Sequence, residues 1–221
     1  MKTPAYIAIA LVAAAAGFGI YRFGIAPGTQ EREERVNAAE AAQVQDEEPA
    51  PAAAMPDVLP DFTLADMEGQ PRSIRSWEGK SMIVNFWATW CAPCRREIPL
   101  LKKIQAEHGA EGFQIVGVAV DFREDVLKYA QEIGIDYPVL IGEQDGLDAV
   151  NKFGQGSLGF PFTVFTDNQQ RIVMFHLGEI HPEQADVFLG AVRKVNGGEL
   201  TIAAARAVAA KQLAALTPPA E

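Results

Sequence analysis

The two cysteines of this 221-residue chain, Cys91 and Cys94, are the residues best suited to chemistry. They form a Cys-x-x-Cys pair between an apolar stretch typical of a buried strand (82–87) and a stretch typical of a helix (95–108). The free N–H groups and positive dipole end of a helix N-terminus stabilise a thiolate and lower the pKa of the first cysteine. Pro93 fits the first turn of a helix, where no N–H is needed. We therefore expect a redox-active dithiol with Cys91 as the nucleophile and Cys94 as the resolving thiol.

Other uses of the cysteine pair fit the sequence less well. A zinc site needs two further ligands at close spacing, whereas the three histidines, His108, His176 and His181, are scattered. A disulfide across so short a loop adds little stability. Haem attachment requires His directly after the second cysteine, where Arg95 stands. We expect no metal and no cofactor beyond a redox-active Cys91–Cys94 disulfide, with metal binding and a structural bridge as the alternatives.

The sequence around the pair is long and specific. Residues 84–99 read VNFWATWCAPCRREIP, and this segment resembles the active-site motif of TlpA/ResA-like membrane-anchored thioredoxins. Further matching segments are Pro60–Leu64, Glu78–Lys80 and Gly159–Pro161, so that the resemblance covers residues 56–196. It implies a protein disulfide reductase, that is, a thiol–disulfide oxidoreductase.

The resemblance also assigns residues to the substrate side of the site. Pro161 matches the cis-proline that faces the dithiol in this family, although an ordinary trans turn proline is the alternative. A cis bond there would hold the backbone of Phe160 beside Cys91, where a substrate segment can add as a short strand. The residues that we expect to contact substrate are Trp90, Ala92, Pro93 and Phe160.

Glu97 is the expected proton-exchanging group. It follows Cys94 by three residues on the expected helix, so its carboxylate can approach the inner sulfur. Burial would raise the pKa of this carboxyl group and allow proton exchange with Cys94. Ordinary thioredoxins carry a buried Asp where this chain has Asn85, which leaves the role to Glu97. A solvated helix carboxylate is the alternative.

Strands and helices alternate after residue 57, which indicates an α/β fold. We expect a thioredoxin-like sandwich with a mixed central sheet, an N-terminal β-hairpin around Gly69 and a helix–strand–helix insertion at 122–155. One transmembrane helix would precede it. The expected strands are 81–88, 113–120, 138–141, 162–166 and 172–176, and the expected helices are 93–107 with a kink at Pro99, 124–133, 146–153, 182–195 and 200–216. His176 and His181 are expected to be solvated loop residues.

The N-terminus differs in composition from the rest of the chain. Residues 3–21 carry no charge and approach the length that spans a bilayer. A cleaved signal peptide ending near Ala14–Ala16 is the alternative. We expect a transmembrane anchor at 1–26, a flexible Ala/Glu/Pro-rich linker at 27–56, a thioredoxin-like domain at 57–196 and a C-terminal helical extension at 197–221. The extension is expected to pack on the domain, with dimerisation or a frayed tail as alternatives.

The net charge and the family resemblance together limit the possible binding partners. The net charge of −10 argues against nucleic-acid binding. The resemblance implies a single-pass protein of the bacterial inner membrane whose domain faces the periplasm. Its substrates would be disulfides in apocytochrome c or in copper-assembly proteins for cytochrome oxidase. Its electron donor would be a membrane protein of the DsbD or CcdA kind.

Four other functions bear on the same residues. An oxidase of DsbA-like direction and a Cu(I)-binding assembly protein that uses the two thiolates are the alternatives. The DsbE-like branch of cytochrome maturation is less favoured, because Gly159–Phe162 replaces its Gly-Ala-Pro-Glu proline loop. A peroxiredoxin would need Thr or Ser at Ala88 and Pro at Val84, so this reading is not supported.

Overall fold

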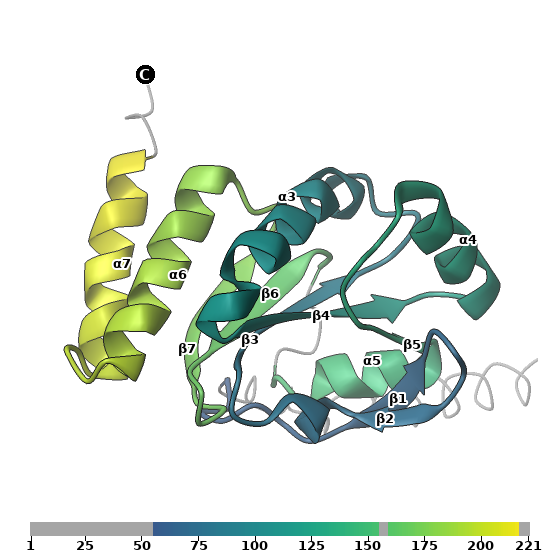
Figure 1. Cartoon of the computed structure of the whole chain (residues 1–221), viewed down its shortest axis with the longest axis horizontal. Helices are drawn as coiled ribbons and strands as arrows, with labels where there is room; N and C mark the ends of the chain where they lie inside the picture. The colour runs from purple at the N-terminus through teal and green to yellow at the C-terminus, as the bar shows by residue number, and fades with distance from the viewer. Residues whose placement is uncertain (1–54, 155–158, 217–221) are drawn as a thin grey trace, which may run out of the picture. The chain divides into compact units, whose positions relative to one another are not determined.

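The computed structural model describes residues 55–154 and 159–216 (Figure 1). The strands are β1 (Thr63–Asp66), β2 (Pro71–Ser73), β3 (Ser81–Trp87), β4 (Phe113–Val120), β5 (Val139–Gly142), β6 (Phe162–Thr166) and β7 (Ile172–Leu177). The helices are η2 (Ile74–Trp77), α3 (Ala92–His108), η3 (Gly109–Glu111), α4 (Arg123–Ile133), α5 (Gln144–Asn151), α6 (Pro182–Asn196) and α7 (Ile202–Leu216). The expected strands and helices are all present, with ends that differ by at most two residues.

The strands form one seven-stranded mixed sheet in the order β2-β1-β5-β4-β3-β6-β7. Strands β3, β4 and β5 run parallel, and every other neighbouring pair is antiparallel. The expected mixed sheet, N-terminal hairpin and helix–strand–helix insertion are therefore confirmed. The hairpin joins the central sheet itself, because β1 pairs with β5.

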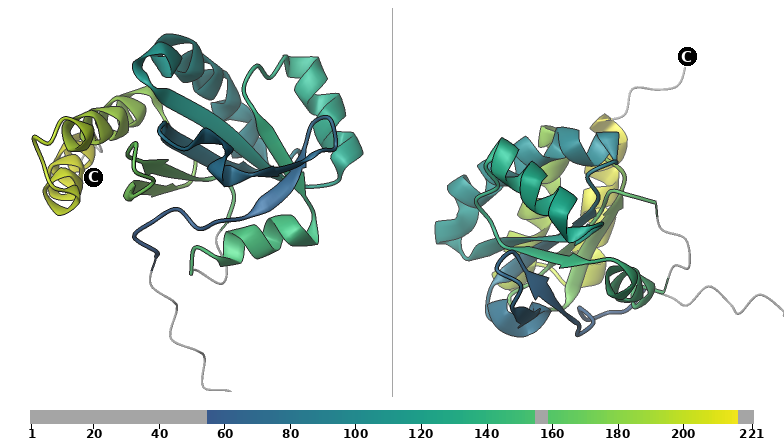
Figure 2. Two further views of the ribbon diagram at one scale, coloured as in Figure 1. Left: turned by 60° about the horizontal axis from the view of Figure 1, so that its bottom comes forward. Right: turned by 90° about the vertical axis from the view of Figure 1, so that its right-hand side faces the viewer.

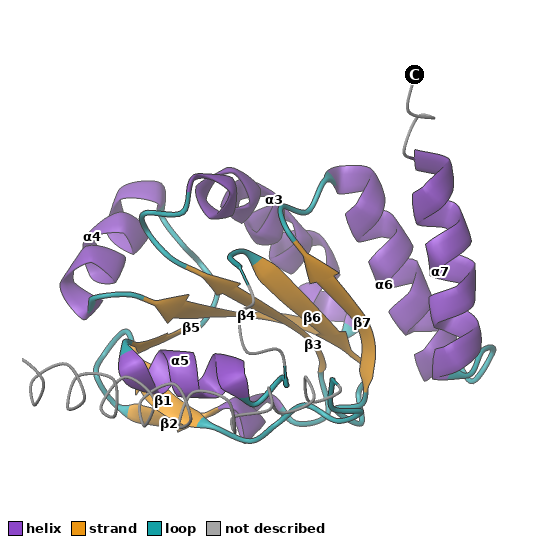
Figure 3. Cartoon of the chain, turned by 180° about the vertical axis from the view of Figure 1, so that it is seen from behind, coloured by secondary structure: helices purple, strands orange, loops and turns teal. Residues whose placement is uncertain are grey.

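Helices cover both faces of this sheet. Helices α3, α4 and α6 pack on the face that carries Ile83 and Trp87, and α5 and η2 pack on the face that carries Val84 and Phe86 (Figures 1 and 3). All seven residues of β3 are buried, as expected for a central strand covered on both sides. Side chains alternate along a strand, so Asn85 points to the α3 face.

Helix α7 lies alongside α6 at one side of the domain (Figure 2). Its buried side chains are alanines, Ala205 and Ala209, which allow close approach to the neighbouring helix. The guanidinium group of Arg206 donates to the carbonyl oxygens of Ile172 and Val173 at 2.7 and 3.0 Å. The expected packing of this helix on the domain is confirmed.

Two expectations need comment. His176 lies in β7, as the expected strand 172–176 has it, but it is half-buried and not solvated as expected, because β7 runs on to Leu177. His181 is exposed as expected and caps α6. The transmembrane helix expected at 1–26 and nearly all of the linker lie outside the described residues, so they stay predictions. Within the described ranges no helix combines the length and apolarity needed to cross a bilayer.

Candidate active site

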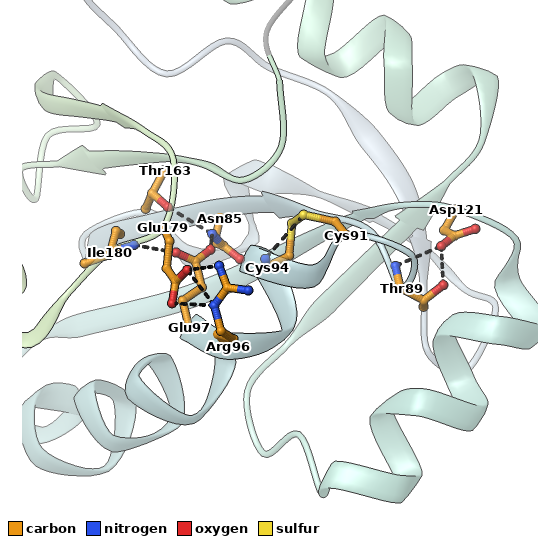
Figure 4. The surroundings of a disulfide bond; sticks show 10 residues. All are labelled: Asn85, Thr89, Cys91, Cys94, Arg96, Glu97, Asp121, Thr163, Glu179 and Ile180. Carbon is orange, nitrogen blue, oxygen red and sulfur yellow. Dashed lines mark hydrogen bonds and ion pairs between the residues drawn. A yellow bond between two sulfur atoms is a disulfide. The ribbon is translucent and has the colours of Figure 1, made fainter.

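The dithiol lies at the N-terminal end of α3, shortly after the end of β3. Cys91 is the N-cap residue of α3, and the N–H of Cys94 donates to its Sγ atom at 3.3 Å (Figure 4). The two cysteines form a disulfide in this structure. Cys91 is 5% exposed and Cys94 is fully buried. When the pair is reduced, the helix N-terminus and the Cys94 N–H stabilise a thiolate on Cys91, the sulfur that an incoming substrate reaches first.

Apolar side chains lie near Cys91: Trp90 directly precedes it, and Phe160 packs against the apolar cluster that includes it. The ring of Trp90 is 69% exposed and lies 6.0 Å from that of Phe160, which is half-buried. The peptide bond between Phe160 and Pro161 is cis. Ala92 is exposed and Pro93 half-exposed at the start of α3. The structure thus places the expected substrate-side residues on one apolar rim, and their roles stay predictions.

Glu97 is a buried residue of α3, three residues after Cys94. Its side chain is 2% exposed, and its two oxygens accept hydrogen bonds from Asn85 Nδ2 at 2.7 Å and from the Ile180 N–H at 2.8 Å. Burial raises the pKa of Glu97 to about 7, and the Glu179 carboxylate adds to the rise. The two hydrogen bonds oppose it, because they favour the charged form. A carboxyl group that titrates near neutral pH is suited to exchange protons with a thiol.

Asn85 is the hydrogen-bond partner that allows Glu97 to be buried without a second carboxyl group beside it. Its Nδ2 group donates both to Glu97 and to Thr163 Oγ1, the latter at 2.9 Å. A carboxylate at residue 85 would have no proton to donate, so two acceptors would face each other and one would have to stay protonated. The amide therefore supports Glu97 instead of competing with it for a proton.

The surroundings of Glu97 contain further buried polar atoms. The hydroxyl of Tyr137 and the Nε1 atom of Trp87 have no hydrogen-bond partner within the described residues. Burial, with the Glu97 charge as the second cause, raises the pKa of Tyr137, so this hydroxyl stays neutral. Gly117 leaves the space between these rings: a Cβ atom there would lie 3.0 Å from Trp87 Nε1 and 3.3 Å from Tyr137 Cε2.

The opposite side of the dithiol turn is held by a residue that the sequence analysis missed. The carboxylate of Asp121 accepts from the N–H and hydroxyl of Thr89 at 2.9 and 2.5 Å (Figure 4). It also accepts from the N–H of Phe122 at 2.8 Å. Phe122 is 62% exposed. The sequence pattern could have predicted this contact: two expected parallel strands, β3 and β4, bring the residues after their carboxyl ends to one edge of the sheet. Asp121 thereby holds the backbone turns that carry two exposed aromatic residues, Trp90 and Phe122.

Within the described part of the chain, no three or more His, Cys, Asp or Glu side chains are grouped so as to hold a metal ion. The two sulfurs of Cys91 and Cys94 are bonded to each other.

Comparison with known proteins agrees with this geometry. The model of the AhpC/TSA family matches residues 55–175. The chain belongs to the AhpC/TSA family. It is 31% identical over 143 residues to the thiol-disulfide oxidoreductase ResA of Geobacillus thermodenitrificans, covering 64% of this chain and 80% of the relative. It is also 30% identical to the thioredoxin-like protein YneN of Bacillus subtilis, covering 58% of this chain and 74% of the relative.

Solved structures show the same fold. A thioredoxin-family thiol:disulfide interchange protein from Chlorobium tepidum superposes with a TM-score of 0.52 at 30% identity, covering 67% of this chain and 98% of that one. A secreted thiol-disulfide isomerase from Corynebacterium glutamicum gives 0.54 at 25% identity, covering 66% and 95%. The expected resemblance and the thioredoxin-like fold are confirmed, and so is the enzyme class of thiol–disulfide oxidoreductase.

Proposed function

We propose that the chain reduces disulfides of protein substrates in the periplasm while anchored in the bacterial inner membrane. The observation that carries this proposal is the buried carboxyl group of Glu97, with its pKa of about 7, on the helix that begins at Cys91. The apolar rim of Trp90 and Phe160 favours a protein segment over a small polar disulfide. No cofactor is required beyond the Cys91–Cys94 pair.

Each turnover moves two electrons from the dithiol to the substrate. The thiolate of Cys91 attacks one sulfur of the substrate disulfide, forms a mixed disulfide and releases the other substrate sulfur as a thiolate. The Cys94 thiol gives its proton to Glu97 and attacks Sγ of Cys91. This step forms the intramolecular disulfide and releases the second substrate thiolate. The two protons lost by the enzyme dithiol balance the two substrate thiolates.

The finer assignment rests on the resemblance to membrane-anchored TlpA/ResA-like proteins. The proposed substrates are disulfides of apocytochrome c or of copper-assembly proteins for cytochrome oxidase. The proposed electron donor is a membrane protein of the DsbD or CcdA kind, which reduces Cys91–Cys94 after each turnover. The uncharged residues 3–21 support the proposed anchor.

A trapping experiment tests the roles of the two sulfurs. The Cys94→Ser variant should accumulate a mixed disulfide with its substrate, because nothing resolves the bond on Cys91. The Cys91→Ser variant should not, since the remaining sulfur is fully buried. Non-reducing electrophoresis and mass spectrometry distinguish the two variants. Equal trapping by both, or trapping by Cys91→Ser alone, contradicts the assignment.

The reduction potential decides the direction. Equilibration with glutathione should give a potential below about −200 mV, the range of reductants, and a value near −120 mV would instead indicate a DsbA-like oxidase. An insulin-reduction assay in the presence of dithiothreitol gives the corresponding activity. Anaerobic titration of the reduced chain with Cu(I) tests the remaining alternative: stoichiometric copper binding without insulin reduction would favour an assembly protein.

A further inference from the structure

The segment between β7 and α6, Gly178–Ile180, connects two parts of the site. The N–H of Gly178 donates to the carbonyl oxygen of Pro161 at 2.8 Å. Two residues later, the N–H of Ile180 donates to Glu97 Oε2, also at 2.8 Å. Gly178 has a φ of +99°, which favours glycine, so the segment can turn sharply between these two bonds. The hydrogen bond to the buried acid therefore depends on how this short segment is held.

An ion pair holds the middle of the segment from outside. The guanidinium group of Arg96 bonds the Glu179 carboxylate, with Nε 2.9 Å and Nη2 2.5 Å from Oε2 (Figure 4). Arg96 directly precedes Glu97 on α3, and neighbouring helix residues point in different directions. Arg96 thus reaches the segment from the solvent side while Glu97 reaches it from the interior. The two residues and the segment form a closed ring.

His176 holds the same residue from β7. Its Nε2 atom lies 3.2 Å from the carbonyl oxygen of Glu179, and its ring packs against Phe188 with centroids 5.3 Å apart. Burial lowers the pKa of His176, so the ring is neutral at neutral pH and can donate its Nε2–H to that carbonyl. The side chain and the main chain of Glu179 are therefore both anchored.

We propose that Arg96 and Glu179 are positioning residues for Glu97, because their ion pair fixes the Gly178–Ile180 segment so that the Ile180 N–H stays hydrogen-bonded to the buried carboxyl group. This inference deepens the proposed function, in which Glu97 exchanges a proton with Cys94. The Arg96 side chain is 61% exposed, and exposed ion pairs contribute little to global stability. The effect of the pair is local and acts on the proton affinity of Glu97.

Within the described part of the chain, four titratable groups bear on the environment of Glu97. Cys94 lies on the same helix, Tyr137 faces it from the residues before β5, and Glu179 and His176 approach from the β7–α6 side. Cys94 does not titrate in the disulfide form, and Tyr137 stays neutral. In the oxidised protein the proton affinity of Glu97 is thus set first by burial, then by its two hydrogen bonds and by the charge at Glu179, with His176 neutral.

The test uses the full chain with the disulfide intact and without substrate. Amide hydrogen exchange of Ile180 and the pH titration of the Glu97 carboxyl carbon are followed by NMR, with Glu97→Gln assigning the carboxyl signal. In Arg96→Met, the Ile180 N–H should exchange at least about tenfold faster, because the segment opens more often. The double variant Arg96→Met/Glu179→Gln removes both charges together, and its Glu97 midpoint should rise by about 0.5 pH unit or more.

The double variant separates positioning from simple electrostatics. If charge alone mattered, removing a cation and an anion together would leave the Glu97 midpoint unchanged or lower. The exchanged pair Arg96→Glu/Glu179→Arg should restore slow exchange at Ile180. Arg193→Met is the matched control, because Arg193 of α6 bonds Glu111 through the same two kinds of nitrogen, Nε and Nη2, without touching the Gly178–Ile180 segment. This variant should change neither readout.

Unchanged Ile180 exchange in Arg96→Met, or an unchanged or lower Glu97 midpoint in the double variant, would overturn the inference. Neither readout requires turnover. A chain that fails to reduce insulin would therefore refute the proposed function while leaving these two measurements standing, so the two failures are distinguishable.

Discussion

Both faces of the central sheet carry an apolar core, but the α3 face adds a buried polar network that starts from strand β3. On the α5 face, Phe86 stacks on Phe162 with ring centroids 4.3 Å apart and meets Phe153 edge-on at 5.3 Å. On the α3 face, the neighbouring residue Asn85 bonds Glu97 and Thr163. Adjacent residues of one strand thus serve an aromatic core and a buried polar network.

This difference between the two faces separates residues that stabilise the fold from residues that exchange protons. Close-packed aromatic rings contribute burial and dispersion without any group that changes charge. A buried carboxyl group costs free energy when it ionises, and that cost moves its pKa toward the pH at which it must work. We expect substitutions on the α5 face to change folding stability and substitutions on the α3 face to change the pH dependence of the protein.

The largest effect is expected on the aromatic face. Phe86→Ala removes a fully buried ring and should lower the free energy of unfolding by about 3–5 kcal/mol, measured by urea denaturation of the oxidised protein. Phe86→Leu serves if the alanine variant does not fold. The reduction potential of the folded variant should stay the same, since the removed ring points away from the dithiol. A change above about 15 mV would show that the two faces are coupled.

The polar face should produce a pH-dependent stability. The pKa of Glu97 is about 4.5 unfolded and about 7 folded, so the folded state holds the extra proton between these values. Stability from this group is complete below the lower pKa and is lost as pH rises through the higher one, by about 3 kcal/mol in all. His176, whose pKa is lowered by burial, acts in the opposite direction.

Comparison with Glu97→Gln isolates this contribution. Between pH 4.5 and pH 8, the free energy of unfolding of the wild type should fall by about 3 kcal/mol relative to that of Glu97→Gln. Glu107→Gln, on the exposed side of the same helix, is the control and should follow the wild type. Parallel curves for Glu97→Gln and the wild type would mean that Glu97 titrates as a solvated carboxylate.

The catalytic consequence of Glu97 should be smaller in energy but visible in turnover. Glu97→Gln should reduce insulin at least about tenfold more slowly at neutral pH, because Cys94 loses its proton acceptor. Removing the negative charge should also lower the apparent thiol pKa of the reduced pair. Alkylation rates against pH, measured beside Glu107→Gln, report this change. Superimposable rate profiles for the wild type and Glu97→Gln would contradict the proposed proton exchange.

The elements of the fold followed from local patterns. The apolar run before Cys91 and the Pro after it were sufficient to place β3 and α3 within two residues of their observed ends. The pairing of β1 with β5 was not accessible in this way, because it depends on which edge of the sheet remains open after the parallel strands assemble. The burial of His176 was not predicted for a related reason: its ring packs against Phe188 of α6, a contact that the strand pattern alone does not show.

The site was predictable where side-chain chemistry carried the signal. The dithiol and Glu97 have residue types and a spacing that point to redox chemistry, and the role of Pro161 came from the family resemblance. The N–H of Ile180 carries no such signal, since every residue except proline has one, and its hydrogen bond to Glu97 spans 83 residues. Thr163 reaches Asn85 only through the antiparallel register of β6 and β3. Contacts of this kind are properties of the fold and not of any motif.

The smallest expected effect concerns exposed apolar residues, and it compares those beside the dithiol with one on the α5 side of the sheet. Trp90 and Phe122 are exposed beside the dithiol, and Asp121 ties together the turns that carry them. Each of Trp90→Ala and Phe122→Ala should raise the KM for a protein disulfide about fivefold, corresponding to ~1 kcal/mol of lost contact. Reaction with a small aromatic disulfide reagent should stay unchanged, because it reaches Cys91 without the rim. Leu147→Ala, an exposed apolar residue of α5, is the matched control. If Leu147→Ala raised the KM as much as Phe122→Ala, substrate recognition would not be confined to the dithiol edge of the sheet.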